Sequence, residues 1–407
     1  MSTRTKALTA VCVCALHLAL LVGELDGWSS VLQLDFGPEA EAIESGALPY
    51  RDQDLEYPPL SIPVIVAPAL FTEGVEDYQR AFEWEMIVFD LAIVALLSLA
   101  LGSDRRRVWG ALGIYTAGVV SLSGVVLDES VIDGVPLALA RFDLVPALLV
   151  LAAGLARERA RSATWSALLA TGTAVKAFPL LLYPALLRGE RNPARVAAGA
   201  SVPLVAAAAI VLAFGDEFGS AISYHAERSL QVETVAATPF ELAHLLGGGA
   251  SSEFGAGSFN LVASGADAAR AASLVLLVAG YGLVLWAGWR RPERPGGHLE
   301  LATALLAVTV AFSPVLSPQF LLWLLPISAA AYGLGRENAV LLIALVLTQL
   351  SLQHYAEAID GLQSGFVWRI AARNLALVAY AFLVCTPIVR EGLSRPSLRP
   401  WPETSST

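Results

Sequence analysis

Long apolar runs alternate with short polar links along the whole chain, and this alternation predicts the fold. The runs are roughly 16 to 23 residues long, enough for a helix to cross a ~30 Å hydrocarbon core with some tilt or thinning. In lipid such runs adopt helices, because a helix satisfies its backbone hydrogen bonds within one segment. We therefore predict an all-α, polytopic transmembrane protein with spans near residues 6–25, 81–101, 108–126, 135–156, 195–214, 270–289, 299–314, 319–334, 338–352 and 366–388.

Two further apolar pieces do not fit this alternation as single crossings. Residues 58–71 lie between two acidic links, and residues 163–187 lie between two basic links. A segment that leaves the membrane on the side where it entered must turn back. Each piece is therefore predicted to be a hairpin or re-entrant pair of short helices, which brings the total to about ten to twelve membrane segments.

The composition excludes an ordinary soluble domain. Hydrophobic residues make up 56% of the 407 positions and charged residues only 15%, whereas soluble domains carry about 25% charged residues. The net charge of −10 does not indicate a basic partner, because positive and negative residues occupy different links. The three cysteines, Cys12, Cys14 and Cys385, lie within predicted spans, which supports neither a disulfide framework nor a zinc site.

Arginine and lysine collect in one set of links, and this bias predicts the orientation. The basic links contain Arg4 and Lys6, residues 105–107, 157–161, 188–195 and 290–294, Arg336, and residues 390–399. By the positive-inside rule these links face the cytoplasm, together with both termini, and the acidic or mixed links face outward. The outward links are residues 26–57, 72–85, 127–133, 215–270 and 353–365. Residues 1–390 are predicted to form one integral membrane domain, and residues 391–407 a disordered cytoplasmic tail.

The outer loop 26–57 concentrates charge beside the membrane. Residues 38–47 are predicted to form a short helix on the membrane surface, since Pro38 suits its start and Gly46 its end. Pro58 and Pro59 suit the first turn of the next helix, whose free N–H groups would face an anion outside. The Asp52-Gln53-Asp54 spacing matches the metal clamp of soluble nucleotide-sugar transferases. We do not favour that clamp, because no segment has the strand, turn and helix order of its Rossmann-like domain.

Six stretches carry a resemblance to a known family. They are the loop around Asp35, then GALPYRDQDLEYPPL (46–60), RFDLVPALL (141–149), GTAVKAFPL (172–180), YHAERSLQVE (224–233) and SPVLSPQFLLWLLP (313–326). In this order they resemble the polyprenyl-phosphate-dependent mannosyltransferases of glycosyltransferase family 87, which have the GT-C fold. The resemblance implies that residues 1–390 are a catalytic domain moving a hexose, mannose in the first instance, from a polyprenyl phosphate sugar to a lipid-linked or glycan acceptor.

The resemblance also implies where the chemistry takes place. A lipid-anchored donor holds its phosphate at headgroup level, which is where this chain collects its charge. The family's catalytic acid matches Asp35, with Glu56 as the second choice. A carboxylate there can accept the proton of the attacking sugar hydroxyl, and direct displacement inverts the anomeric centre. We expect neither a metal nor a cofactor to be required.

The leaving phosphate needs positive charge more than an acid. Arg228 is the first candidate, with His225 three positions before it, and Lys176 and Arg373 follow. The predicted substrate-binding residues are Arg51, Asp52, Asp54, Tyr57, Lys176, His225, Arg228, Gln231, Gln319 and Arg373.

Charged residues inside membrane spans are energetically costly, so they are expected to be paired, hydrated or functional. Arg141 and Asp143 stand two apart and cannot face each other on a helix, so they are predicted to pair with other spans. For Lys176, at the break of the hairpin 163–187, a substrate contact and simple snorkelling both stay open. Ser317 and Pro318 predict a helix cap and first turn that leave Gln319 free for a sugar hydroxyl, and Trp323 is predicted to pack in the core.

A multi-span transporter or lipid flippase is the alternative function. It would be expected to show inverted repeats and broken helices that meet at the midplane, whereas the charges here gather at the outer rim. The predicted location is the cell membrane, with the active site on its outer face. The expected partners are the donor, the acceptor and membrane lipid, with no nucleic acid.

Overall fold

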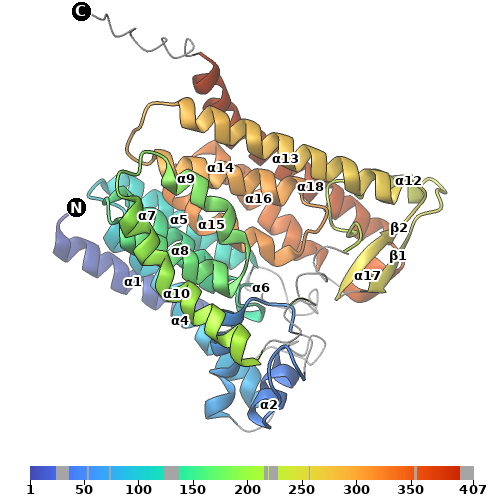
Figure 1. The fold of residues 1–407 in the computed structure, drawn as a ribbon. Coiled ribbons are helices and arrows are strands. Elements are labelled where there is room, and N and C mark those ends of the chain that lie inside the picture. The colour runs from blue at the N-terminus through green and yellow to red at the C-terminus, as the bar shows by residue number, and fades with distance from the viewer. Residues whose placement is uncertain are drawn as a thin grey trace, which may run out of the picture.

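A computed structural model describes residues 1–23, 36–52, 55–72, 75–122, 137–214, 219, 228–255, 257–352 and 355–394 (Figure 1). The N-terminal half contains α1 (Thr3–Val22), α2 (Gly37–Glu44), η2 (Pro59–Ser61), α3 (Ile62–Val66), η3 (Ala69–Phe71), α4 (Val75–Ala100), α5 (Arg105–Leu122), α6 (Leu137–Ala140), α7 (Leu144–Glu158), α8 (Ser162–Val175), η5 (Phe178–Leu182), α9 (Tyr183–Leu187) and α10 (Pro193–Phe214). The C-terminal half contains α12 (Thr238–His244), β1 (Ser251–Gly255), β2 (Ser258–Val262), α13 (Ala266–Arg290), α14 (Gly297–Phe312), η6 (Pro318–Phe320), α15 (Leu321–Tyr332), α16 (Arg336–Ser351), α17 (Tyr355–Asp360) and α18 (Ser364–Leu393).

The all-α, polytopic prediction is confirmed, and each predicted span contains a helix. In the described part of the chain, α1, α10, α13 and α18 are long and apolar enough to cross a membrane on their own. The span predicted at 135–156 is interrupted, because Arg141, Phe142 and Asp143 separate α6 from α7. Helix α18 runs to Leu393, three residues past the predicted domain boundary, and the rest of the predicted tail from residue 395 lies outside the described residues.

The two pieces that did not fit as single crossings are broken, as predicted. Residues 58–71 form the short turns η2, α3 and η3, and residues 163–187 form α8 followed by η5 and α9. The second break falls at Lys176, whose backbone is extended (φ −154°, ψ 132°) just after α8 ends. Pro179 follows in the first turn of η5, where its missing N–H costs no helical hydrogen bond. The break therefore leaves Lys176 at the tip of the hairpin.

Helices α14 and α15 form the centre of the core, since nearly all of their side chains are buried. Apolar side chains of α1, α10 and α13 are instead exposed, including Val11, Val202 and Val278, as expected of helices that face lipid. Small residues allow close helix contacts: a Cβ on Gly199 of α10 would lie 2.1 Å from the Ala163 carbonyl oxygen of α8.

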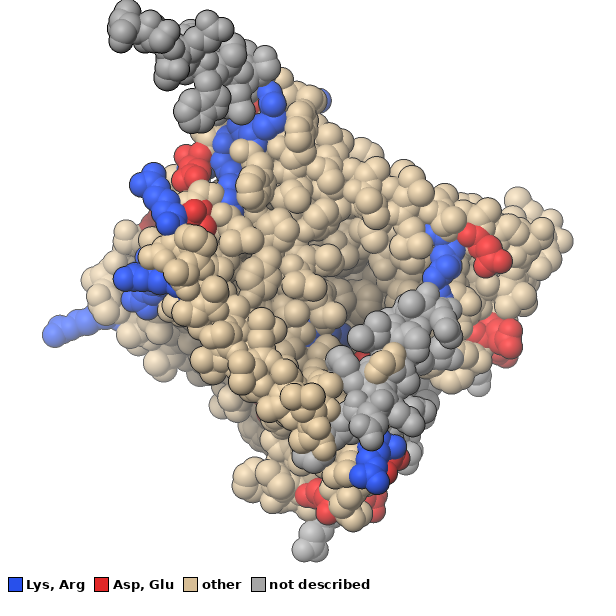
Figure 2. Space-filling model, viewed as in Figure 1, with Lys and Arg blue, Asp and Glu red and all other residues tan. Residues whose placement is uncertain are grey.

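The predicted basic links meet at one end of the bundle, which we call the basic end (residues 1–6, 99–107, 157–161, 186–195, 290–300, 330–337 and 390–394). Arg157 donates to the Leu186 and Arg188 carbonyls at 2.7 Å, and Arg291 bonds Glu300 at 2.9 Å and Glu391 at 2.8 Å. In Figure 2, blue side chains gather at the left and upper left, toward the N-terminus. The described parts of four predicted outward links lie at the opposite end, which we call the loop end (residues 36–52, 55–57, 75–85, 228–255, 257–270 and 355–365); the link 127–133 lies outside the described residues. Which end faces the cytoplasm stays a prediction.

Cysteine labelling tests the orientation. In a variant whose three native cysteines are replaced, single cysteines at Gln53 and Ser229 should react with a membrane-impermeant thiol reagent in intact cells. A cysteine at Ser103, which is exposed at the basic end, should react only after the cells are lysed. Labelling of Ser103 alone in intact cells would reverse the assigned orientation.

A β-hairpin at the loop end was not predicted. Strands β1 and β2 pair antiparallel, from Ser251 opposite Val262 to Gly255 opposite Ser258, and the Ser252 hydroxyl donates to the Ile359 carbonyl at 2.7 Å. Two five-residue strands carry little periodic signal within a long polar loop. An isolated hairpin of this size is marginally stable, and two neighbours supply the missing packing. Helix α17 contacts β1, and the 228–234 segment pairs with β2 through a bridge between Gln231 and Asn260.

Candidate functional site

A buried ion pair lies at the loop end, between the tip of the re-entrant hairpin and the start of α7. The Lys176 Nζ donates to both carboxylate oxygens of Asp143, at 2.7 and 2.9 Å. The Asp143 side chain is 1% exposed and that of Lys176 is 13% exposed. The prediction that Asp143 pairs with another segment is confirmed. Lys176 does not snorkel, because its ammonium is turned inward to Asp143.

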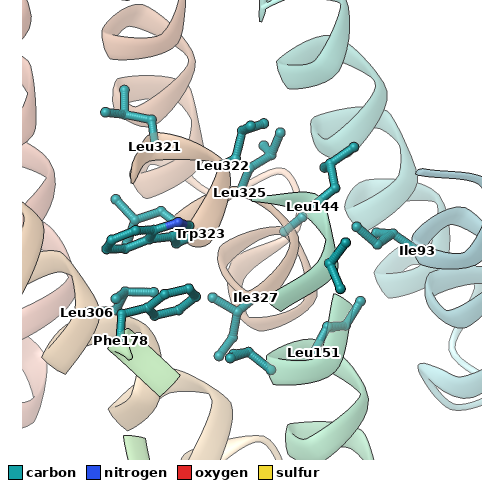
Figure 3. Close-up of a cluster of buried hydrophobic side chains, with 14 of the residues drawn as sticks. Ile93, Leu144, Leu151, Phe178, Leu306, Leu321, Leu322, Trp323, Leu325 and Ile327 are labelled. Carbon is teal, nitrogen blue, oxygen red and sulfur yellow. The ribbon is translucent and has the colours of Figure 1, made fainter. Parts of the chain in front are cut away.

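Trp323 of α15 fixes the other side of Asp143. Its indole N–H donates to the Asp143 Oδ1 atom, so one carboxylate oxygen accepts from both the lysine and the indole. The indole ring is stacked against two phenylalanine rings, with centroids 4.0 Å from Phe178 and 3.9 Å from Phe320. Figure 3 shows Trp323 lying parallel to Phe178 within the apolar core. The core packing predicted for Trp323 is thus confirmed, with a hydrogen bond added.

Four aromatic rings surround the Lys176 ammonium. Its nitrogen lies 5.1 Å from the ring centroid of Phe142, 5.6 Å from those of Tyr57 and Trp323, and 5.9 Å from that of Phe320. A cation at this distance is attracted by the negative ring faces, most strongly where water is excluded. We call these residues the Lys176 cluster: Tyr57, Phe142, Asp143, Lys176, Phe320 and Trp323.

Local chain breaks place these side chains. Asp143 is the N-cap residue of α7, where the helix dipole favours a negative charge. Phe320 and Trp323 flank the start of α15, which follows the turn η6. Pro318 takes the first position of η6 as predicted, but the Ser317 side chain makes no capping hydrogen bond. Each contributor is thus near a helix end, where side chains from several segments can converge.

Glu56 and Tyr57 join the cluster from the outer loop. The pKa of Tyr57 is raised well above its ordinary value, chiefly by burial and then by the charge of the neighbouring Glu56 carboxylate. Phe36, which follows Asp35 in the sequence, packs on Tyr57 and Phe142 with ring centroids 5.7 and 5.3 Å apart. The loop therefore sets the Tyr57 ring beside the Lys176 ammonium, with the Glu56 carboxylate next to Tyr57.

A second polar cluster lies where the 228–244 segment packs on α18. We call it the Arg373 cluster: Gln231, Glu233, Glu241, Arg373 and Asn374, each 5% exposed or less. The Arg373 guanidinium donates to the Glu233 carbonyl at 2.5 Å. Asn374 donates to the Thr234 carbonyl at 3.1 Å and to the Thr238 hydroxyl at 2.7 Å. These bonds hold the segment on the helix.

Glu241 is fully buried in this second cluster, and its carboxyl oxygens have no hydrogen-bond partner in the described part of the chain. Burial raises its pKa to about 8, against the opposing charge of Arg373. At neutral pH Glu241 is therefore mostly protonated, which lowers the cost of burying it.

Gln231 links the two clusters. Its backbone N–H donates to the Pro314 carbonyl at 3.1 Å, and its side-chain oxygen accepts from the Leu316 N–H at 2.8 Å. Residues 313–316 lead directly into η6 and α15, which supply Phe320 and Trp323 to the Lys176 cluster. A displacement of the 228–234 segment would therefore reach both clusters.

The other predicted site residues that the structure describes are Arg51, Asp52, Arg228, Gln319 and Arg373. Arg51 and Asp52 are exposed, and Asp52 accepts from the Leu48 N–H at 2.9 Å, which closes a turn. Arg228 and Gln319 are half-buried, and Arg373 is fully buried. Asp35, Asp54 and His225 lie outside the described residues, so the Asp52–Asp54 clamp and the His225–Arg228 pair stay untested. Among the described side chains, no group of three His, Cys, Asp or Glu residues could hold a metal ion.

The structure brings Tyr57 and Lys176 together, and the sequence did not indicate that combination. Asp143 could be found as an in-span charge that needed a partner, but not as the partner of Lys176. Glu241 and Asn374 gave no signal, because polar residues in a long outer loop or once in a helix are unremarkable without their contacts.

The fold and this site define a polytopic helical membrane protein with a polar, aromatic-lined cluster at one end. A profile of glycosyltransferase family 87 matches residues 55–318, more than half of the chain. The chain therefore belongs to glycosyltransferase family 87 and is a glycosyltransferase. The matched range includes Glu56, Lys176, Arg228 and Gln231, whereas Asp35 and Arg373 lie outside it. No curated protein matches the chain.

Proposed function

We propose that this glycosyltransferase moves a hexose, mannose in the first instance, from a polyprenyl phosphate sugar to a lipid-linked or glycan acceptor on the outer face of the cell membrane. The observation that carries the proposal is the contact of the outer-loop residue Tyr57 with the Lys176 ammonium at the loop end. Glu56 lies next to Tyr57, so the loop brings a phenol to the cation and a carboxylate to the phenol. A lipid-anchored donor would present its phosphate and sugar at this depth.

The reaction is a direct displacement at the anomeric carbon. The acceptor oxygen forms the new bond to that carbon while the bond to the phosphate oxygen breaks, and its electron pair leaves with the polyprenyl phosphate. The acceptor proton passes to a carboxylate, for which Asp35 is the first choice and Glu56 the second. Attack from the face opposite the phosphate inverts the configuration.

The leaving phosphate gains negative charge as the bond breaks, so cations that contact it speed the reaction. Arg228 is the first candidate because its guanidinium can form two parallel bonds to phosphate and its side chain is half-buried. We assign Lys176 to the same anion, beside its carboxylate partner. Arg373 is the weakest of the three, because it is fully buried and holds the Glu233 carbonyl.

Sugar hydroxyls need donors and acceptors around them. We assign this role to Arg51, Asp52, Asp54, Tyr57, Gln231 and Gln319, with His225 beside the phosphate. Figure 2 shows the middle of the face hollowed, below α13.

A donor assay tests the proposed reaction. The purified protein with a membrane extract as acceptor should consume a polyprenyl phosphate hexose, mannose being used best, and should not consume nucleotide sugars. A nuclear magnetic resonance spectrum of the product should show the anomeric configuration opposite to that of the donor. Use of a nucleotide sugar would refute the assigned donor. Retention of configuration would refute the direct displacement.

A further inference from the structure

Tyr50 closes the part of the outer loop that carries the proposed reacting groups. Its side chain is 2% exposed, and its hydroxyl donates to the Tyr57 carbonyl at 2.7 Å. The bond ties Tyr50 to the backbone of Tyr57, seven positions along the chain. Glu56 and Tyr57 stand at the end that the bond holds.

The same loop is tied at its start by a turn. The Arg51 and Asp52 N–H groups donate to the Leu48 carbonyl at 3.2 and 2.9 Å, and the Leu48 N–H donates to the Asp52 carboxylate at 2.9 Å. Tyr50 has a φ of +66° within this turn. A tyrosine rarely adopts this left-handed conformation, which persists only where surrounding contacts require it.

The contacts beyond Tyr57 lead into the Lys176 cluster. The Tyr57 ring lies 4.9 Å from the Phe142 ring and 5.6 Å from the Lys176 ammonium. The Glu56 carboxylate lies near the Tyr57 hydroxyl and adds to the rise of its pKa. A shift of the Tyr57 backbone would move the carboxylate and the phenol together, away from the cation.

From these contacts we infer that Tyr50 is a positioning residue for glycosyl transfer: its hydroxyl holds the Tyr57 carbonyl and so sets the Glu56–Tyr57 pair against the Lys176 cluster. The inference rests on the proposed function, because it assigns Glu56 and Tyr57 to the site of transfer. Tyr50 itself touches no substrate in this assignment. Its effect passes through the main chain of Tyr57.

Tyr78 provides a matched control. Its hydroxyl also donates to a backbone carbonyl, that of Ile65, at 2.8 Å, and its side chain is 4% exposed. Tyr50→Phe and Tyr78→Phe thus remove the same kind of buried hydrogen bond. Only the first removes it from a residue of the Lys176 cluster.

The first measurement compares the two variants as full-length protein in steady-state hexose transfer. Tyr50→Phe should lower kcat about tenfold with little change in the donor KM, because a displaced carboxylate and phenol impair the reaction more than donor capture. Tyr78→Phe should stay within twofold of the parent in both constants, while the two variants lose similar thermal stability. A Tyr50→Phe kcat within twofold of the parent would overturn the inference. An equal loss of kcat in the two variants would overturn it as well.

The second measurement needs no activity. Trypsin cleaves after the exposed Arg51, and cleavage requires the loop to open locally. The cleavage rate of each folded protein is divided by the rate for the same chain when denatured. This ratio should be at least about threefold higher for Tyr50→Phe than for the parent protein, and unchanged for Tyr78→Phe. Unchanged cleavage would show that Tyr50 does not hold the loop. Faster cleavage of Tyr50→Phe, combined with no hexose transfer by the parent protein, would refute the proposed function. The role of Tyr50 in holding the loop would then still stand.

Discussion

Asp35→Asn is expected to reduce hexose transfer by a factor of at least about one hundred while protein yield and donor binding stay normal. The amide has nearly the shape of the carboxylate but cannot accept the proton of the attacking hydroxyl, and general-base catalysis contributes roughly 10²–10⁴-fold. The measurement is kcat at saturating donor and acceptor, with donor binding measured separately.

Two controls make the result specific to Asp35. Glu41→Gln removes an exposed carboxylate from α2, in the same outer loop, and should leave turnover unchanged. Glu56→Gln should lower turnover less than Asp35→Asn, because it removes only the negative charge beside the Tyr57 hydroxyl. If Asp35→Asn turns over normally and Glu56→Gln is inactive, the base is Glu56.

Lys176→Met is expected to lose both stability and donor use. The substitution leaves Asp143 as a buried charge whose cation is gone, and breaking a buried pair from one side costs about 3–5 kcal/mol. The Trp323 N–H still donates to Asp143 but cannot neutralise it. Thermal unfolding in detergent and kcat/KM for the polyprenyl phosphate hexose measure the two losses.

The double variant Lys176→Met with Asp143→Asn separates the two roles. The neutral amide removes the uncompensated charge, so most of the lost stability should return. Donor use should stay at least about tenfold below that of the parent, because the phosphate still lacks the ammonium. Recovery of both properties in the double variant would show that Lys176 serves only to neutralise Asp143, and the phosphate role would rest with Arg228.

These experiments address a site that is built from helix ends. Asp143 begins α7, Lys176 follows α8, and Trp323 lies in the first turn of α15. Breaks in membrane helices are tolerated where protein or water surrounds the backbone rather than lipid. The breaks in this chain therefore serve a purpose: they bring polar side chains from separate helices to one place at the loop end.

The amino-acid sequence by itself determined the long helices, the breaks within residues 58–71 and 163–187, and the sorting of basic links to one end, but not the break between α6 and α7. Lipid leaves helices as the only choice for long apolar runs, so composition and length settle each span locally. Pro179 and the polar break at Lys176 marked the re-entrant hairpin, and the arginine-rich links marked the basic end. In-span charges such as Asp143 were recognisable as residues that required partners.

Only the tertiary structure decided which partners meet. Lys176 lies 33 positions from Asp143, and Trp323 lies 180 positions from it. No local pattern encodes their contact, because it depends on how α7, α8 and α15 pack. The same holds for the fold of the β-hairpin and for Glu241, whose burial comes from α18. Local sequence sets what each segment must bury, whereas the packing of distant segments determines which charges, rings and hydrogen-bonding groups meet in the site.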